Sequence, residues 1–101
     1  MALSKLQLSE LLSIYGDLLT GKQREAVSMY CDCDCSLAEI ANETGISRQG
    51  VRDAIIKSEA ALVKFESTIH LARLIKDLSK AISSDDDKEL KEIAIKFISK
   101  E

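Results

Sequence analysis

The segment from Ser36 to Lys57, SLAEIANETGISRQGVRDAIIK, constrains the fold more than any other part of the chain. Ser36 and Glu39 have the S-x-x-E spacing of a capping box, in which each side chain accepts a hydrogen bond from the other's free backbone N–H where a helix begins. Gly45 stands where the chain must reverse, and glycine tolerates the positive φ that such a turn often needs. Ser47 offers a second N-cap. The segment therefore predicts two short helices joined by a tight turn.

The second of these predicted helices has two different sides. Val51 and Ile55 share a buried side with Ile40 of the first helix, and we expect Ile46 to fill the corner between them. Long polar side chains then face outward from the first turns. In a helix-turn-helix, these positions reach base edges and phosphates in the major groove of DNA. The candidate nucleic-acid-binding residues are Ser47, Arg48, Gln49, Arg52 and Lys57.

The composition indicates a single all-α domain. The chain has 101 residues, no proline and four glycines, which suits one modest core built from helices. No apolar run approaches the roughly 20 residues of a membrane span. The first residues also lack the charged, apolar and small-residue pattern of a signal peptide. We therefore expect a cytoplasmic protein that makes no use of a membrane.

The charge of the chain argues against strong binding to nucleic acid by one protomer. The formal net charge is −3, whereas freestanding DNA-binding domains are usually basic because phosphate neutralisation supplies much of their affinity. Residues 20–64 carry six Lys or Arg against seven Asp or Glu. Binding is expected to be weak for each protomer, or to be helped by dimerisation or by a partner.

Three cysteines alternate with aspartates in the run Cys31–Asp32–Cys33–Asp34–Cys35. An odd number of cysteines in a chain without a secretion signal argues against a disulfide framework. Zinc sites normally use C-x₂₋₄-C pairs together with a second pair or a histidine, and the one histidine, His70, is far along the sequence. We expect Cys31 and Cys35 to be small buried apolar side chains near a helix end. The alternative is adventitious metal binding or oxidation. We expect no metal site and no cofactor.

The rest of the chain predicts three further helical stretches. One runs from about Gln7 to Leu19, and a second begins at Gly21 after a T-x-x-Q capping box formed by Thr20 and Gln23. The last is expected over about Asp86–Ser99. Its apolar residues, which we expect to be buried, are Leu90, Ile93, Ala94, Phe97 and Ile98.

The second helix of the motif has no obvious stop. Residues 51–83 contain neither glycine nor proline, and apolar residues recur from Val51 to Ile82 at mostly three- and four-residue steps. A three-helix head cannot cover so long an apolar stripe. Either a partner subunit covers its far half in coiled-coil fashion, or the last helix folds back on it. We expect residues 1–101 to form one helix-turn-helix domain in which residues 67–101 are a helical extension used for dimerisation, through the stripe between Phe65 and Ile82 with or without the last helix.

Two family resemblances rest on these motifs. The run LTGKQREAV, followed by SLAEIANETGISRQGVRDAIIKSEAAL, resembles region 4 of bacterial sigma factors. It is more similar to the YlxM family of small bacterial proteins, over roughly Leu18–Leu71. The YlxM resemblance implies a regulatory helix-turn-helix protein connected to the signal recognition particle pathway. It also implies that Gly50 replaces a small residue such as alanine, which would make the recognition helix slightly less stable.

Three classes of function follow. The leading hypothesis is a DNA-binding regulatory protein that acts as a homodimer, with DNA a better ligand than RNA because a helix cannot enter the narrow major groove of A-form RNA. The alternative is a protein–protein adaptor that docks on a targeting GTPase or an RNA polymerase subunit, or an RNA-associated accessory factor. An ordinary αα-hairpin whose outward arginines only solubilise a bundle would show the same pattern. With no nucleophile–base pair and no Gly-rich phosphate loop, we expect neither an enzyme nor a small-molecule substrate.

Overall fold

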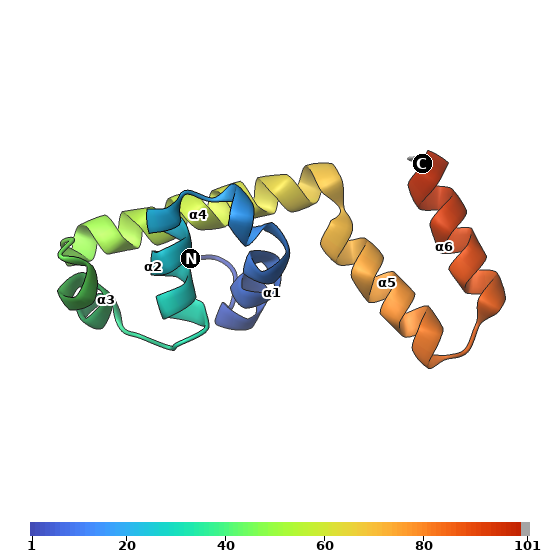
Figure 1. The fold of residues 1–101 in the computed structure, drawn as a ribbon, viewed down its shortest axis with the longest axis horizontal. Helices are drawn as coiled ribbons and strands as arrows, with labels where there is room; N and C mark the ends of the chain where they lie inside the picture. The colour runs from blue at the N-terminus through green and yellow to red at the C-terminus, as the bar shows by residue number, and fades with distance from the viewer. Residues whose placement is uncertain (100–101) are drawn as a thin grey trace. The chain divides into compact units, whose positions relative to one another are not determined.

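The computed structural model describes residues 1–99, which are all helix and connecting turn (Figure 1). The prediction of an all-α helix-turn-helix fold is confirmed. The elements are α1 (Lys5–Tyr15), a short 3-10 helix η1 (Gly16–Leu18), α2 (Gly21–Cys31), α3 (Leu37–Thr44), α4 (Arg48–Ile69), α5 (Leu71–Ser83) and α6 (Asp87–Ser99). The predicted five helical stretches are thus six α-helices within residues 1–99, because the long stretch after the turn is divided.

Capping boxes begin each of the first three helices. Those at Thr20 and Ser36 were predicted, and both are complete in the structure. A third, at Ser4 with Gln7, begins α1 at Lys5, two residues before the predicted start. In each box the serine or threonine oxygen accepts the third residue's N–H, which satisfies backbone groups that a helix end otherwise leaves unpaired.

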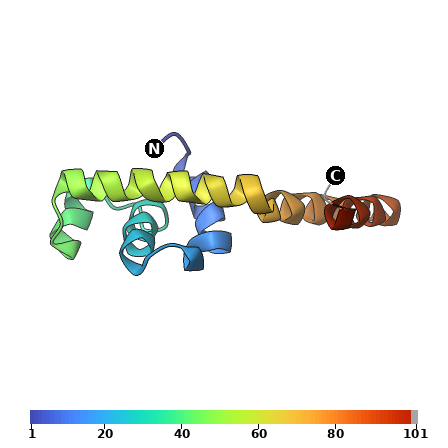
Figure 2. The ribbon, with the colours of Figure 1, turned by 90° about the horizontal axis from the view of Figure 1, so that it is seen from above.

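The first compact unit comprises residues 1–68. Figure 2 shows α4 as a long rod with α1, α2 and α3 gathered on one side of it. The side chains that these helices bury together form the core of the unit. They are Leu8, Leu12, Tyr15, Ala26, Val27, Ile40, Val51, Ile55 and Leu62.

A buried carboxylate ties the start of the chain to the middle of α4. Glu59 is 7% exposed, and its Oε1 accepts the backbone N–H of Ala2 at 2.7 Å and of Leu3 at 3.0 Å. Its Oε2 lies 3.2 Å from the amino nitrogen of Met1. A buried charge is tolerated only when it is paired and hydrogen-bonded. Here the amino group of Met1 pairs with the carboxylate, and the N–H groups of Ala2 and Leu3 donate hydrogen bonds to it.

The apolar stripe that starts in α4 does not continue as one helix. His70 has φ 59° and ψ 25°, in the left-handed region, so α4 ends at Ile69 and α5 begins at Leu71. Histidine is among the few non-glycine residues enriched in that conformation. The sequence left open whether residues 48–82 form one continuous helix, and the conformation of His70 divides them into two.

The second compact unit, of which residues 69–99 are described, is a helical hairpin of α5 and α6. Ala81 is its one buried apolar side chain among these residues. Within one chain α6 does not bury its five apolar residues as predicted, since Leu90 and Ile93 are half-buried while Ala94, Phe97 and Ile98 are exposed. Two helices have a single mutual contact face, which leaves the rest of the apolar surface of α6 uncovered.

Candidate nucleic-acid interface

The turn between α3 and α4 is built by three successive residues. Gly45 has φ 75° and ψ 6°, and its N–H donates to the carbonyl of Ala41 at 2.9 Å, which ends α3. Thr44 Oγ1 donates to the carbonyl of Ile40 at 2.7 Å and accepts the N–H of Ile46 at 3.4 Å. The predicted positive φ at Gly45 is confirmed. The carbonyls of Ile40 and Ala41 thus find donors within the turn, which helps to fix the direction in which α4 leaves it.

Ser47 begins α4 as an N-cap. Its Oγ accepts the N–H of Gly50 at 3.0 Å, and its carbonyl accepts the N–H of Val51 at 2.9 Å. Val51 and Ile55 are fully buried and form one cluster with Ile40 and Ala26. These contacts set the rotation of α4 about its own axis, and with it the set of residues that faces solvent.

The predicted site residues are all exposed. Ser47, Arg48, Gln49 and Arg52 stand together in the first turns of α4 and are exposed. Within residues 1–99, Arg48 and Arg52 make no hydrogen bond or ion pair with another side chain, so their guanidinium groups are available. Lys57 is also exposed but lies about 13 Å further along the axis from Arg48, at about 1.5 Å per residue. Nine residues are about two and a half helical turns, so Lys57 points to the opposite side of α4 from Arg48.

One residue of this surface escaped the sequence-based prediction. Gln49 Nε2 donates a hydrogen bond to Asp53 Oδ1 at 3.0 Å, and Asp53 is exposed like Gln49. The signal was present in the sequence, because Gln and Asp four residues apart on a helix can form a side-chain hydrogen bond. Asp53 had been counted only as one of the acidic residues of the region.

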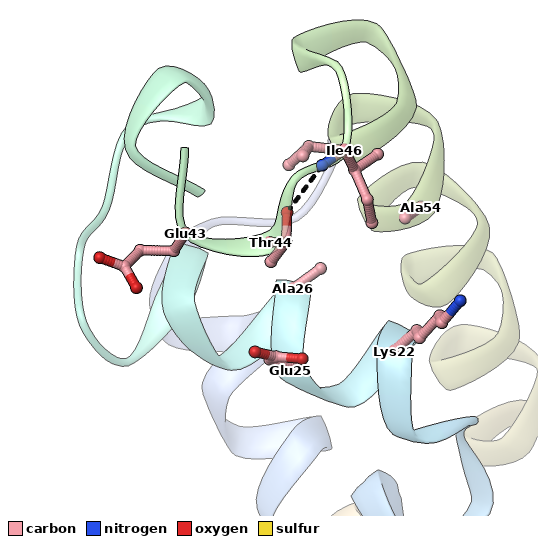
Figure 3. A pocket seen from close by; sticks show the side chains of 8 residues that line it. Lys22, Glu25, Ala26, Glu43, Thr44, Ile46 and Ala54 are labelled. Carbon is pink, nitrogen blue, oxygen red and sulfur yellow. Dashed lines mark hydrogen bonds between the residues drawn. The ribbon is translucent and has the colours of Figure 1, made fainter. Parts of the chain in front are cut away.

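A hollow of about 240 Å³ lies beside the turn, between α2 and the start of α4 (Figure 3). Ile46, which was expected to fill the corner, lines this hollow and is 37% exposed. That part of the prediction is wrong. Sites for small ligands usually have volumes of about 300–1,000 Å³, so the hollow is smaller than such sites. Its lining residues are Lys22, Glu25, Ala26, Glu43, Thr44, Ile46, Val51 and Ala54.

The cysteine loop between α2 and α3 is half-buried rather than buried. Cys31 and Cys35 are partly covered and Cys33 is exposed, which corrects the predicted burial of the first two. Burial, helped by the Asp32 carboxylate, raises the pKa of the Cys31 thiol to about 11, and burial also raises the pKa of Cys35. Thiolates are the metal-binding form, and these two are disfavoured. In the part of the chain that is described, no group of three or more His, Cys, Asp or Glu side chains is placed to hold a metal ion.

The sequence pattern of a family described as "Putative helix-turn-helix protein, YlxM / p13 like" matches residues 3–100, nearly the whole chain. The chain belongs to this family. The YlxM/p13-like match includes the complete turn and the outward residues of α4, so the surface described above lies on the element that gives the family its description. Among the described helices, none is both long and apolar enough to cross a membrane.

Several relatives in the YlxM/p13-like family are similar over much of the chain. A UPF0122 protein of Clostridium kluyveri is 48% identical over 67 residues, which make up 66% of this chain and 60% of that protein. A UPF0122 protein of Mycoplasma capricolum is 47% identical over 66 residues, or 65% of this chain and 58% of that protein. A UPF0122 protein of Shouchella clausii is 41% identical over 87 residues, or 79% of this chain and 80% of that protein. The matched region thus spans about 60% of the first two relatives.

Proposed function

We propose that this protein is a non-enzymatic regulator that binds duplex DNA through the start of α4. The observation that carries the proposal is the exposed pair Arg48 and Arg52, which lack side-chain partners at the start of a helix that Val51 and Ile55 fix in the core. Arginine forms bidentate contacts with guanine edges and with phosphates. In this proposal Arg48 and Gln49 contact bases, while Ser47, Arg52 and Lys57 contact the backbone.

The proposal includes a homodimer formed through the α5–α6 hairpin. A unit of some 30 residues is too small to be stable on its own core, and units of this size usually need oligomerisation or covalent staples. Several of its large apolar side chains are also uncovered: Ile82 and Ile95 are each 66% exposed and Ile98 is 79% exposed. A second copy offers the same apolar surface. Two DNA-contacting helices would compensate for the weak affinity that the net charge of −3 implies for one.

DNA is the preferred ligand in this proposal because an α-helix fits the major groove of B-form DNA and not that of A-form RNA. The resemblance to YlxM proteins is what connects the proposed regulation to the signal recognition particle pathway.

The double substitution Arg48→Ala/Arg52→Ala tests the proposed surface. It should weaken binding to a pool of random-sequence DNA duplexes by about tenfold or more and lower the slope of log affinity against log salt by about one, for the lost phosphate contact of Arg52. Because both side chains are exposed, thermal stability should change by no more than about 0.5 kcal/mol. A gel-shift titration at several salt concentrations measures the affinity and its salt slope.

The matched control is Lys88→Ala/Lys91→Ala, which removes the same charge from exposed positions of α6. It should leave the affinity nearly unchanged. Equal affinities of the Arg48→Ala/Arg52→Ala protein and the wild type for the duplex pool would overturn the proposal.

A protein–protein adaptor is the second candidate, favoured by the same uncovered apolar surface of α5 and α6 and by the acidic net charge. The two candidates differ in their salt dependence. Contacts to phosphates weaken steeply as salt is added, whereas apolar docking does not.

A further inference from the structure

The hydrogen bond between Gln49 and Asp53 determines how the Gln49 amide can be oriented. A carboxylate has acceptor atoms only, so the group that faces Asp53 Oδ1 at 3.0 Å must be the Nε2 amide of Gln49 and not its Oε1. Rotating the amide by half a turn would place Oε1 against the carboxylate, and two acceptors repel each other. The order of donor and acceptor along the edge of Gln49 is therefore set by its neighbour.

This bond leaves Gln49 with one free N–H and one free carbonyl oxygen. In the major groove, adenine presents an acceptor at N7 beside a donor at N6, which matches that pair of groups. Guanine presents two acceptors, N7 and O6. To bond both acceptors of guanine, Gln49 would need both of its amide protons, and Asp53 has already taken one. The free oxygen would then face O6 of guanine.

We propose that Asp53 is a positioning residue that makes Gln49 select adenine over guanine at one base of the DNA site. This inference rests on the proposed DNA-binding function and specifies what one part of that surface recognises. The carboxylate also repels the phosphates of every DNA sequence, so Asp53 weakens binding in general while it sharpens the choice of base. That trade-off gives a function to an exposed acidic side chain that directly follows Arg52 in the sequence and bonds Gln49.

The test begins with selection of bound sequences from a pool of random DNA duplexes by the wild-type protein and by Gln49→Ala. The selected wild-type sequences should share an adenine that Gln49→Ala no longer selects. Affinities are then measured for two synthetic duplexes that carry either the selected A·T pair or a G·C pair at that position. The wild type should prefer the A·T duplex by about tenfold, within the usual discrimination of one bidentate contact.

Three variants separate positioning from charge. Asp53→Asn keeps the shape but can either accept from or donate to Gln49, so the preference for adenine should fall by about tenfold while both duplexes are bound more tightly. Asp53→Glu keeps an acceptor-only carboxylate and should retain the preference. Glu43→Gln removes an equal charge from an exposed position on α3. It should leave the preference unchanged.

The outcomes distinguish this inference from the proposed function. Wild-type binding to the pool with no base preference, or an Asp53→Asn protein that discriminates like wild type, would overturn the role of Asp53 and leave DNA binding intact. If the wild type retains no more duplex than Arg48→Ala/Arg52→Ala does, both proposals are wrong. Because Gln49 and Asp53 are exposed, thermal melting of each variant should match the wild type and confirm that the fold is unchanged.

Discussion

At Gly45 the backbone adopts φ 75° and ψ 6°, and no atom lies within 4 Å of the place where a Cβ would stand. A substitution there therefore meets backbone strain and no steric clash. Gly45→Val should destabilise the protein by about 1–2 kcal/mol in urea unfolding, and Gly45→Asn by less, because asparagine tolerates the left-handed conformation.

Gly21 provides the control for Gly45. It also has open space around its Cβ position, but its φ is not in the positive range. Gly21→Ala should be neutral or stabilise the protein by up to about 1 kcal/mol. A Gly45→Val protein with the unfolding midpoint of the wild type would contradict the structure of the turn.

At Glu59 the stability of the protein is linked to pH. Burial raises the pKa of the carboxyl, but hydrogen bonds from the Leu3 N–H, the amino terminus and the Ala2 N–H outweigh burial and lower the pKa below its ordinary value of 4.5. The folded state thus favours the charged form. This contribution is complete above the ordinary pKa and is lost as the pH falls through the lowered pKa of the folded state.

Glu59→Gln should accordingly destabilise the protein by about 1–2 kcal/mol near pH 7, since bonds to a charged acceptor become bonds to a neutral one. The difference from wild type should shrink when urea unfolding is repeated in acid, below the pKa of the folded state. Glu25→Gln, at an exposed position of α2, should show neither effect. If Glu59→Gln lowered the free energy of unfolding by the same amount in acid, the loss of stability would not come from the charge of Glu59.

At the scale of the element, the start of α4 is shaped by the space around Gly50. A Cβ at this position would lie 2.7 Å from Ile46 Cγ2 and 3.1 Å from Ser47 Oγ. Helix propensity alone predicts that alanine would stabilise α4 by about 0.5–1 kcal/mol. The contact with Ile46 predicts that alanine would instead destabilise α4, because Cγ2 is attached directly to the Cβ of Ile46 and cannot move away freely.

We therefore expect Gly50→Ala to destabilise the wild-type protein by about 1 kcal/mol or more. In an Ile46→Ala background, the same change should be neutral or stabilising by up to about 1 kcal/mol, because the clashing methyl group is gone. A double-mutant cycle in urea measures this coupling. If Gly50→Ala has the same effect in both backgrounds, Ile46 is not what keeps this position a glycine.

At the scale of the whole molecule, the proposed dimer depends on the apolar surface of the α5–α6 hairpin. Ile82 is 66% exposed, so a glutamate there disturbs little within one chain but cannot be buried unpaired against a second copy. Ile82→Glu should convert dimers into monomers in sedimentation equilibrium. Lys80→Gln changes the charge by the same amount at an exposed position of α5 and should remain dimeric. A wild-type chain that is monomeric at its highest soluble concentration would rule out the dimer.

The sequence alone determined those features that depend on residues within one helical turn of each other. Four such features are local, because their hydrogen bonds join residues no more than four apart. They are the capping boxes at Thr20 and Ser36, the turn at Gly45 and the N-cap at Ser47. The outward direction of Gln49 followed as well, because the helical period places it away from the buried Val51 and Ile55. The exposure of Arg48, which stands three residues before Val51 on the same side of α4, was decided by the tertiary structure.

Only the tertiary structure decided the features whose causes lie far apart in the chain or in the geometry of packing. The donors that Glu59 binds are more than 50 residues away, so no local pattern could identify its role. The stop at His70 depends on a backbone conformation that histidine can adopt but does not require. The exposure of Phe97 and Ile98, likewise, reflects how little surface α5 can cover, and a periodic apolar face shows that burial is favourable without showing which surface provides it.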